Sequence, residues 1–318
     1  MTISIKIFNK NLTQDWNSFL DNSLQSSFLF HRSFINYHYD KFTDKSLMIY
    51  DDQQLIGLFP AAEDKKNNKN IISHPGITYG GIIQQGRLRG ENMIEALKLI
   101  ICFYSKEKYK KLIYKATPSI YSRNLSEDDL YALKVLGAKL IRSDLSSVIN
   151  LNNPLELSSR RKRSFNKASK NGIKLSDNLE EISFFWELLK NNLQTKYKTN
   201  PVHTINEIKK LLTLFPENIK YYGAILNSKI LAGVVIFINQ TNYHVQYAAS
   251  NELGRDNNAL DFIFNKIINM AKSEKKIWFD FGISTEKKGN FLNTNLYKFK
   301  NEFGAGSILY NFYEINIK

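Results

Sequence analysis

The clearest sign of chemistry in the sequence is a polar turn that follows a short apolar run. Residues 276–281 are predicted to form a strand, and Asp280-Phe-Gly-Ile-Ser-Thr285 ends it. Ligands of α/β proteins gather at the carboxyl ends of strands. A buried carboxylate there can accept or orient the proton of an amine, which makes Asp280 a candidate catalytic residue. Gly282 would let a ligand approach the backbone closely. The alternative is that Asp280 only caps the next turn.

A second group of candidates lies on the predicted strand 242–249. Successive residues of a strand point to opposite faces of the sheet, so His244 and Gln246 are expected on one face and Val245 and Tyr247 on the other. A buried strand seldom carries histidine, glutamine and tyrosine together without a use for them. We therefore predict that Gln246 binds substrate and that Tyr247 takes part in catalysis. Ordinary polar packing on the sheet is the alternative.

A strongly basic helix is predicted over residues 157–171, and Gly172 ends it. Seven cations and no acid occur between Arg160 and Lys174. Four of them share one helical face because their spacing is i, i+3, i+7 and i+10: Arg160, Arg163, Lys167 and Lys170. This row predicts contact with phosphate groups of a nucleotide-sugar, a lipid carrier or tRNA. Arg160 and Arg163 are the preferred candidates, since only arginine offers a planar fork of donors. A solvated basic face is the alternative.

Two loop-like segments supply further candidates for binding an acceptor. Residues 74–81 are His-Pro-Gly-Ile-Thr-Tyr-Gly-Gly, in which His74 and Tyr79 are candidate substrate-binding residues. Residues 195–204 contribute Lys196 and His203. For each histidine, the alternative is a structural role with its hydrogen bonds satisfied inside the fold.

Metal and covalent chemistry are not expected. The five histidines lack the spacing of metal ligands, so we predict no metal site. The single cysteine, Cys102, lies in an apolar helical pattern, which excludes a disulfide framework and a cysteine-based zinc site. The Gly-x-Ser-x-Gly motif of α/β-hydrolases is absent from the sequence.

The elements that must position these residues follow one order in both halves of the chain. Helices precede a meander of about three strands, which continues into helix, strand, helix and strand. In the first half we predict strands at 3–8, 47–50, 55–60, 112–116, 138–141 and 147–151, helices at 13–24, 34–42, 90–105 and 128–136, and a polar loop at 63–70. In the second half we predict helices at 157–171, 180–193, 204–214, 258–271 and 292–303, and strands at 173–176, 219–226, 229–238, 242–249, 276–281 and 307–317.

This repeated order predicts two α/β (α+β) domains of similar topology, each with a mixed, mainly antiparallel sheet flanked by helices. The boundary is expected at a polar break that contains Pro154, which gives domains 1–153 and 154–318. We see no close sequence identity between the halves, so the repeat is inferred from the order of elements alone.

Composition and charge fit a globular protein with a phosphate-bearing partner. Apolar residues make up 43% of the chain and charged residues 23%, both ordinary values. The formal net charge is +14, and a basic surface suits anionic partners; a compositional bias toward Lys, Asn and Ile is the alternative. Apolar runs are too short to span a membrane and the N-terminus has no apolar signal region. We therefore expect a cytoplasmic protein without stable membrane insertion.

Several segments together give the sequence a resemblance to a known group of enzymes. They are Ser73–Gly81, Arg160–Ile173, Asp280–Thr285, and Tyr297-Lys-Phe-Lys300 with Phe303-Gly304. In their order and spacing they resemble the tandem-GNAT branch that includes the Fem peptidyltransferases and related acetyltransferase domains. The resemblance covers most of the chain. It implies two tandem GNAT-like domains, a substrate held between them, and transfer of an acyl or aminoacyl group to an amine.

The same resemblance implies roles for two residues of the last predicted helix. Lys300 matches the Phe-Lys of the Fem pattern, in which the lysine reaches the reacting carboxyl group, so an electrostatic catalytic role is implied for it. Without the resemblance, a lysine on a helix would be interpreted as a solvated surface charge. Tyr297 begins the same motif and is implied to bind substrate.

One departure from the GNAT pattern concerns the acyl donor. A GNAT domain that uses CoA usually has a glycine-rich turn after its fourth strand, where backbone N–H groups hold the pyrophosphate. The corresponding residues 249–258 contain one glycine, Gly254, and one cation, Arg255. We therefore expect no tightly bound cofactor. The donor is either acyl-CoA, held weakly or in a modified way, or aminoacyl-tRNA.

The sequence thus predicts an N-acyltransferase of cell-envelope biogenesis, in the class that transfers groups other than aminoacyl groups. Its expected acceptor is a phosphate-bearing small molecule, such as a nucleotide-linked amino sugar. The first alternative is a Fem-like ligase that uses aminoacyl-tRNA to add an amino acid to a peptidoglycan precursor. The second is a non-catalytic nucleic-acid-binding protein, which is disfavoured because aromatic residues do not interleave with the basic helix. The oligomeric state is left open.

Overall fold

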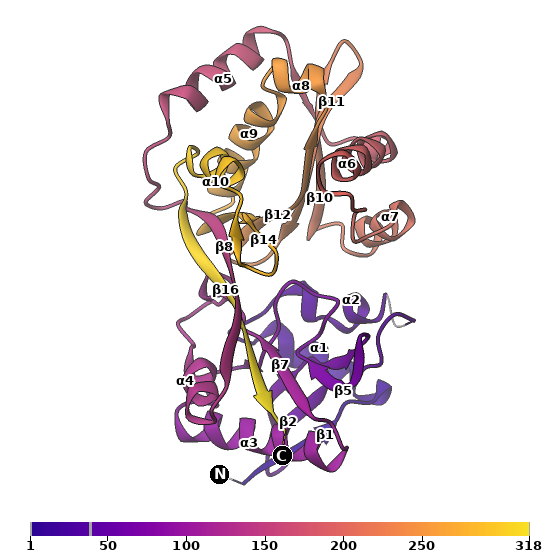
Figure 1. Ribbon diagram of the computed structural model, residues 1–318, viewed down its shortest axis with the longest axis vertical. Coiled ribbons are helices and arrows are strands. Elements are labelled where there is room, and N and C mark those ends of the chain that lie inside the picture. The colour runs from indigo at the N-terminus through magenta and orange to yellow at the C-terminus, as the bar shows by residue number, and fades with distance from the viewer. Residues whose placement is uncertain (1, 38–39, 318) are drawn as a thin grey trace. The chain divides into compact units, whose positions relative to one another are not determined.

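The computed structural model describes residues 2–37 and 40–317 and divides the chain into two compact units. Unit 1 consists of Met1–Leu145, Thr285–Phe291 and Leu309–Lys318, and unit 2 of Ser146–Ser284 and Leu292–Ile308. Two strands, β8 (Lys139–Asn150) and β16 (Gly306–Asn316), each contribute residues to both units (Figure 1).

Unit 1 contains a helical pair and two groups of strands. The helices α3 and α4 pack against each other, and α3 also packs against β1. The elements are β1 (Ile3–Ile7), α1 (Thr13–Asp21), α2 (Arg32–Asn36), β2 (Leu47–Asp51), β3 (Gln54–Phe59), β4 (Ala62–Asp64), β5 (Asn67–Ile72), β6 (Ile83–Gln84), α3 (Glu91–Lys106), β7 (Lys111–Lys115) and α4 (Asp128–Val135), with short 3₁₀ helices at Lys10–Leu12, Phe28–Phe30 and Ser119–Tyr121.

The strands of unit 1 pair in the orders β1-β2-β3-β6 and β4-β5-β7-β16. The pairing of β5 with β7 is parallel and covers Asn70↔Lys111 to Ile72↔Ile113. The pairs β1–β2, β2–β3, β3–β6, β4–β5 and β7–β16 are antiparallel. The core lies between the strands and α3, where apolar residues recur at helical spacing: Met93, Ala96, Leu97, Ile100 and Tyr104 face it.

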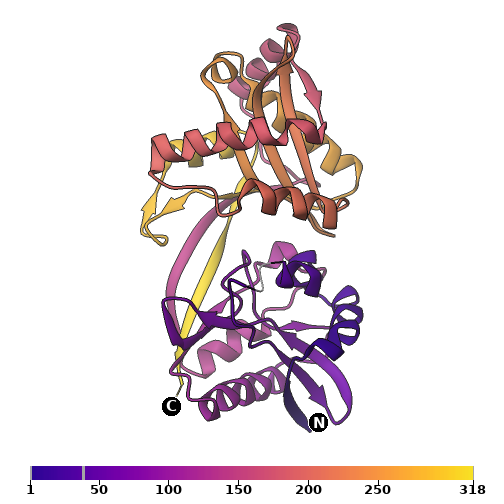
Figure 2. The same ribbon diagram turned by 90° about the vertical axis from the view of Figure 1, so that its right-hand side faces the viewer.

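Unit 2 has a long meander with helices on both faces. Figure 1 shows α6 and α7 on one face of the sheet and α9 on the other, and Figure 2 turns α6 and α7 toward the viewer. The elements are α5 (Ser159–Lys170), β9 (Lys174–Ser176), a 3₁₀ helix at Leu179–Glu181, α6 (Ile182–Tyr197), α7 (Ile205–Leu214), β10 (Ile219–Leu226), β11 (Lys229–Ile238), β12 (Asn242–Ser250), α8 (Glu252–Asp256), α9 (Ala259–Ser273), β13 (Trp278–Ile283), β14 (Thr285–Glu286), β15 (Phe291–Leu292) and α10 (Thr294–Asn301). The short strands β14 and β15 pair with each other, and β14 and Phe291 of β15 are assigned to unit 1.

The strand order in unit 2 is β16-β8-β13-β12-β11-β10-β9. The meander β10-β11-β12 is antiparallel, whereas β12 and β13 are parallel because α9 connects them. The hairpin between β10 and β11 turns at Asn227 and Ser228, whose positive φ angles of 48° and 60° are typical of a two-residue hairpin turn. The predicted fold class is confirmed: both units combine mixed, mainly antiparallel strand arrangements with flanking helices.

The units differ from the predicted domains in their boundary. The chain leaves unit 1 between Leu145 and Ser146, inside β8, whereas the boundary was expected at residue 153. The C-terminal part of β16 belongs to unit 1, because Phe312–Asn316 pair with β7. A proline-bearing break is a local signal, but the division follows strand pairing between residues far apart in the sequence, which local signals do not report.

Most predicted helices and strands are confirmed within a few residues, and several elements differ. The expected polar loop at 63–70 forms the hairpin β4–β5, and the two strands expected at 138–141 and 147–151 are one strand, β8. The short helices α2 and α8 and the strands β14 and β15 also depart from expectation; the predicted helix 34–42 falls partly outside the described residues. Polar strands such as β5 carry little hydrophobic periodicity, which is why the pattern missed them.

Candidate active site at the separation of β12 and β13

The two parallel strands of unit 2 pair over a short stretch and then separate. Their register is Asn242↔Trp278, Tyr243↔Phe279 and His244↔Asp280. Beyond His244, the described part of β12 pairs with β11, and β13 shifts its register against β8 between Asp280 and Ile283. His244 and Asp280 are the last paired residues. They therefore lie where the two parallel strands begin to separate.

The carboxylate of Asp280 is fully buried and holds three hydrogen bonds. Its Oδ1 accepts from Ser146 Oγ at 2.6 Å and from the backbone N–H of Gly282 at 2.8 Å. Its Oδ2 lies 2.8 Å from His244 Nδ1. Gly282 has a φ of +76°, a backbone conformation that glycine adopts without strain, and this turn brings its N–H back to the carboxylate.

Lys300 reaches the same turn from α10. Its ammonium donates to the carbonyl oxygens of Gly282 at 2.8 Å and Ile283 at 2.7 Å, and the side chain is 7% exposed. Burial lowers the pKa of Lys300 to about 8, while the charge of Asp280 acts in the opposite direction. An ammonium has three donors, so two of them fix its position and one is left over. The alternative interpretation of Lys300 as a solvated surface charge is therefore wrong, and Asp280, Gly282 and Lys300 lie together.

A second polar group on β12 surrounds Tyr247. The Tyr247 hydroxyl lies 2.6 Å from His203 Nδ1, and Trp186 of α6 packs edge-on against the Tyr247 ring. Gln246 also hydrogen-bonds Tyr247. Burial raises the pKa of Tyr247 to about 12. The structure thus gathers three predicted residues, Gln246, Tyr247 and His203, beneath α6.

A β-bulge changes the predicted faces of β12. Tyr247 pairs with Val235 while Val245 pairs with the next residue, Ile236, so Gln246 is the extra residue. Val245 packs in the core that α9 covers, whereas Tyr247 packs against α6. The expectation that Val245 and Tyr247 share a face is therefore wrong. Because of the bulge, Tyr247 lies on the same face as His244.

The basic helix α5 has one arginine in the core and its other cations outside. Arg161 is 5% exposed and pairs with Asp261 at 2.7 Å and with Glu302 at 2.8 Å. Its guanidinium also lies 4.2 Å from the centre of the Phe299 ring. The predicted row is exposed on the helix, with Arg160 3.7 Å from Glu302: Arg160, Arg163, Lys167 and Lys170.

The remaining predicted binding residues are buried in unit 1 or lie on helices of unit 2. His74 and Tyr79 belong to unit 1 and are each 1% exposed. The Tyr79 hydroxyl bonds to Ser27, and the ammonium of the buried Lys115 binds the carbonyl oxygens of His74 and Ile77, which fixes their loop. In unit 2, Lys196 is exposed near the end of α6. Tyr297 is half-buried on α10, three residues before Lys300.

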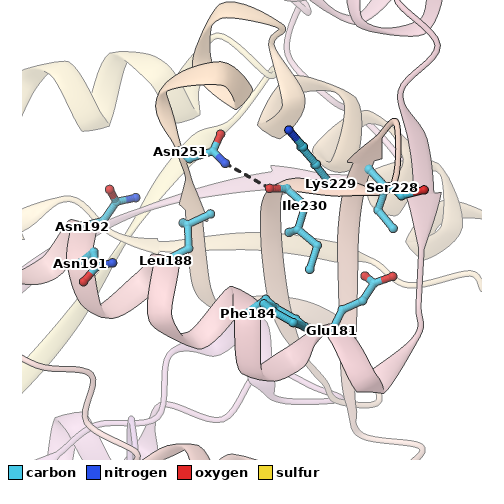
Figure 3. Close-up of a pocket in the computed structure, with 10 residues that line it drawn as sticks. Glu181, Phe184, Leu188, Asn191, Asn192, Ser228, Lys229, Ile230 and Asn251 are labelled. Carbon is cyan, nitrogen blue, oxygen red and sulfur yellow. Dashed lines mark hydrogen bonds between the residues drawn. The ribbon is translucent and has the colours of Figure 1, made fainter.

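A groove of about 590 Å³ lies between α6 and the β10–β11 hairpin (Figure 3). Asn251 Nδ2 donates to the Ile230 carbonyl at 3.1 Å and joins the start of α8 to the hairpin. The groove contains none of the predicted site residues; its lining is Glu181, Phe184, Leu188, Asn191, Asn192, Ile225, Ser228, Lys229, Ile230 and Asn251. The groove adjoins the carboxyl-terminal end of β12. That end is six residues beyond His244, a distance of roughly 20 Å at the rise of an extended strand.

The lone glycine of the expected pyrophosphate turn has a packing role. A Cβ on Gly254 would lie 2.3 Å from the Leu231 carbonyl oxygen and 2.4 Å from Ser250 Oγ. Gly254 therefore allows α8 to pack closely on β11, and α8 itself is a five-residue helix capped by Asn251. The weak or modified binding of CoA stays a prediction.

Replacing Gly254 by Ala is expected to lower the free energy of unfolding by about 1–3 kcal/mol, because the new methyl group overpacks a backbone contact. Denaturant unfolding measures the change. Leu253→Ala is the matched control: Leu253 is half-exposed on the same helix, and its loss should change stability by no more than about 0.5 kcal/mol. A Gly254→Ala protein of unchanged stability that has lost donor binding would make Gly254 a phosphate-binding residue instead.

Three residues of the site were missed from the sequence. His244 belongs to the same strand as Gln246 and Tyr247, but only the pairing of β12 with β13 shows that it lies opposite Asp280. Ser146 is 134 positions from Asp280, and no local pattern joins them. Arg161 was counted among the cations of the basic helix; its place opposite the exposed row, in line with Phe165 and Ala168 at i+4 and i+7, is the signal that could have marked it as buried.

Within residues 2–37 and 40–317, no group of three or more His, Cys, Asp or Glu side chains is placed to hold a metal ion. None of the helices in the described part of the chain has the length and apolar character needed to cross a bilayer.

Comparison with known proteins identifies the fold. No protein-family model and no curated protein sequence matches this chain. Among solved structures, FemX has a TM-score of 0.69 at 12% identity, with 98% of this chain and 96% of FemX covered. L-PGS from Bacillus licheniformis has a TM-score of 0.62 at 11% identity, covering 94% and 90%. A tandem GNAT protein from the clavulanic acid biosynthesis pathway has a TM-score of 0.52 at 9% identity, covering 100% and 99%. The chain therefore has a fold like that of FemX and of this tandem GNAT protein, as the sequence predicted.

Proposed function

We propose that this protein is a cytoplasmic transferase that moves an acyl or aminoacyl group onto an amino group of a phosphate-bearing cell-envelope precursor, such as a nucleotide-linked amino sugar. The observation that carries the proposal is the buried ammonium of Lys300, which two carbonyl groups fix beside the buried Asp280 where β12 and β13 separate. A buried cation held in place at an opening in the sheet is suited to stabilise charge that develops on a substrate.

The proposed reaction makes an amide from an activated ester or thioester. The amine nitrogen attacks the carbonyl carbon, the C–N bond forms, and the bond from that carbon to the carrier oxygen or sulfur breaks. The carbonyl oxygen carries negative charge in between, and the remaining N–H donor of Lys300 is the group proposed to stabilise it. The amine gives up a proton, and the carrier leaves with one, so the reaction needs no oxidant or metal.

The donor class is the open part of this proposal. One structural neighbour is described as a putative lysylphosphatidylglycerol synthetase, a name that refers to a lysyl group on a lipid. The tandem GNAT neighbour is described in relation to acetyl-CoA. Likeness to both supports keeping aminoacyl and acyl donors, so the narrower expectation that aminoacyl groups are excluded is not part of the proposal. The packing role of Gly254 favours a donor other than tightly bound CoA.

The exposed cations of α5 are proposed to hold phosphate groups of the acceptor or donor. Replacing Arg160 and Arg163 together by Gln should raise KM with kcat nearly unchanged, because phosphate contacts remote from the reacting atoms contribute equally to the ground and transition states. The loss should shrink at high salt, since screening already weakens the attraction in the wild type. Initial rates at two ionic strengths test this. An equal fall in kcat and kcat/KM would contradict a binding role.

The function itself is tested by mass spectrometry of the acceptor after incubation with enzyme. The donors are acetyl-CoA and alanyl-tRNA, and the acceptors are a UDP-linked amino sugar and a peptidoglycan precursor peptide. The proposal predicts an acceptor whose mass rises by one acyl or alanyl group through an amide bond. Binding of RNA in the absence of transfer with every pair would support the non-catalytic alternative instead.

A further inference from the structure

The reaction proposed above needs a group that takes the proton of the attacking amine. Besides Lys300, the described residues include four titratable side chains that belong to β12 and β13 or contact them: Asp280, His244, Tyr247 and His203. Asp280 was the candidate favoured by the sequence. The contacts of Asp280, His244 and Tyr247 indicate the role of each.

Asp280 is poorly suited to be the base. Its two oxygens accept from Ser146 and Gly282 and face the ring nitrogen of His244, and hydrogen bonds of this kind favour the ionised carboxylate. A proton placed on it would have to displace one of these donors. Tyr247 is no better, because burial raises its pKa to about 12, so at neutral pH the phenol keeps its proton.

His244 has the arrangement of an oriented base. A carboxylate only accepts hydrogen bonds, so the contact of Asp280 Oδ2 with Nδ1 at 2.8 Å places the imidazole proton on Nδ1 and the lone pair on Nε2. Ser146 holds the other oxygen of the carboxylate and so fixes its plane. The His244 side chain keeps a small exposed area, 8% for the residue, at the end of the paired strands.

One residue, Gly282, links Asp280 and its partner His244 to Lys300. The N–H of Gly282 donates to Asp280, while the carbonyl oxygen of the same residue accepts from Lys300. The position of the imidazole and the position of the ammonium are therefore set by the same glycine turn. A Cβ on Gly282 would lie 3.6 Å from His244 Cε1, which shows how closely the turn approaches the ring.

We infer that His244 is the general base of this site, and that Asp280 and Ser146 are positioning residues that hold its imidazole. This inference rests on the proposed transferase function. Nε2 takes the proton from the amine as the C–N bond forms, and the imidazolium is stabilised by Asp280. The same proton is then passed to the departing oxygen or sulfur of the carrier, which returns His244 to its starting form.

The test combines kinetics with a tautomer measurement. Transfer to the acceptor that the wild type modifies is measured for His244→Gln, Asp280→Asn and Ser146→Ala, with His31→Asn in unit 1 as the control histidine. His244→Gln should lower kcat/KM by about 10²–10⁴, the range for loss of a general base. His31 caps α2 through its side chain, a role that Asn can take over, so this control should stay within about twofold of the wild type.

Asp280→Asn separates a positioning role from a merely structural one. Its amide can donate to Nδ1, which would move the imidazole proton to Nε2 and block the base, as such a change does in serine proteases. Nitrogen-15 NMR of the ring nitrogens, with the His244 signals assigned by their loss in His244→Gln, should show Nδ1–H in the wild type and Nε2–H in Asp280→Asn. Ser146→Ala should keep the wild-type tautomer and lower the rate less than Asp280→Asn does.

The outcomes distinguish this inference from the function on which it rests. If the wild type transfers the group and His244→Gln does so within about threefold, His244 is not the base and the transferase function stands. If the wild-type signals show Nε2–H, the assigned orientation is wrong whatever the rates are. If the wild type transfers no group from either donor, the proposed function fails, and the role of His244 as a base fails with it.

Discussion

Replacing Lys300 by Met is expected to lower kcat and kcat/KM together by about 10²–10³ and to leave KM nearly unchanged. The size is typical of removing one donor from an oxyanion site, and equal loss in both constants indicates an interaction made only in the transition state. Initial-rate kinetics with the identified donor and acceptor measure it. Lys298→Met is the control, because Lys298 lies two positions away on α10 and is exposed. A Lys300→Met enzyme with normal turnover would remove the lysine from the mechanism.

The pH dependence of kcat/KM gives a second test of the role of Lys300. Because the pKa of Lys300 is about 8, its ammonium is present below that pH and is lost as the pH rises through it. The wild-type kcat/KM should therefore fall above about pH 8. Lys300→Arg should lack this fall, since arginine stays charged at such pH values. Stability must be measured alongside, because Lys300 is buried and Lys300→Met leaves two carbonyl groups without their donor.

Replacing Arg161 by Met is expected to cost about 3–5 kcal/mol of folding stability, the range for removing one partner of a buried ion pair. Asp261 and Glu302 would lose the guanidinium that they share, and the pKa of Asp261 is already raised by burial. The packing of Arg161 on the Phe299 ring would be lost as well. Denaturant unfolding at neutral pH measures the difference.

The matched control for Arg161 is Arg163→Met, two residues along α5. Arg163 is exposed, so its replacement should change stability by no more than about 0.5 kcal/mol. The pair separates two functions of one basic helix, with Arg161 holding the helix to the core and Arg163 proposed to meet phosphate. Equal, small effects of both changes would show that the buried pair contributes little.

The sequence predicts those parts of the fold that depend on patterns within a single segment. It does not predict pairing between segments that are far apart in the chain. The meander of unit 2 was predicted closely because β10, β11 and β12 carry long apolar runs separated by short turns. The hairpin β4–β5 was not, since its exposed polar residues show no clear period. The assignment of Leu309–Lys318 to unit 1 goes with the pairing of β16 with β7, about 200 residues apart, which no local signal records.

The candidate site shows the same limit. Asp280, Gly282 and Lys300 were chosen from their residue types, from their place after a strand and from the family resemblance, and the structure brings them together. The bulge at Gln246 reversed the expected face of Tyr247, because one extra residue changes the alternation along the rest of a strand. His244 and Ser146 were missed because their roles depend on register and on a contact across 134 positions.

The most direct test of this account is a crystal structure of the protein with a non-reactive analogue of its donor. We predict that the carbonyl oxygen of the analogue lies about 3 Å from Lys300 Nζ, within hydrogen-bond reach, at the separation of β12 and β13. The carbonyl carbon should face His244 Nε2 across the space that the amine would occupy. An analogue bound instead in the groove between α6 and the β10–β11 hairpin, or in unit 1, would contradict the placement of the reaction at His244, Asp280 and Lys300.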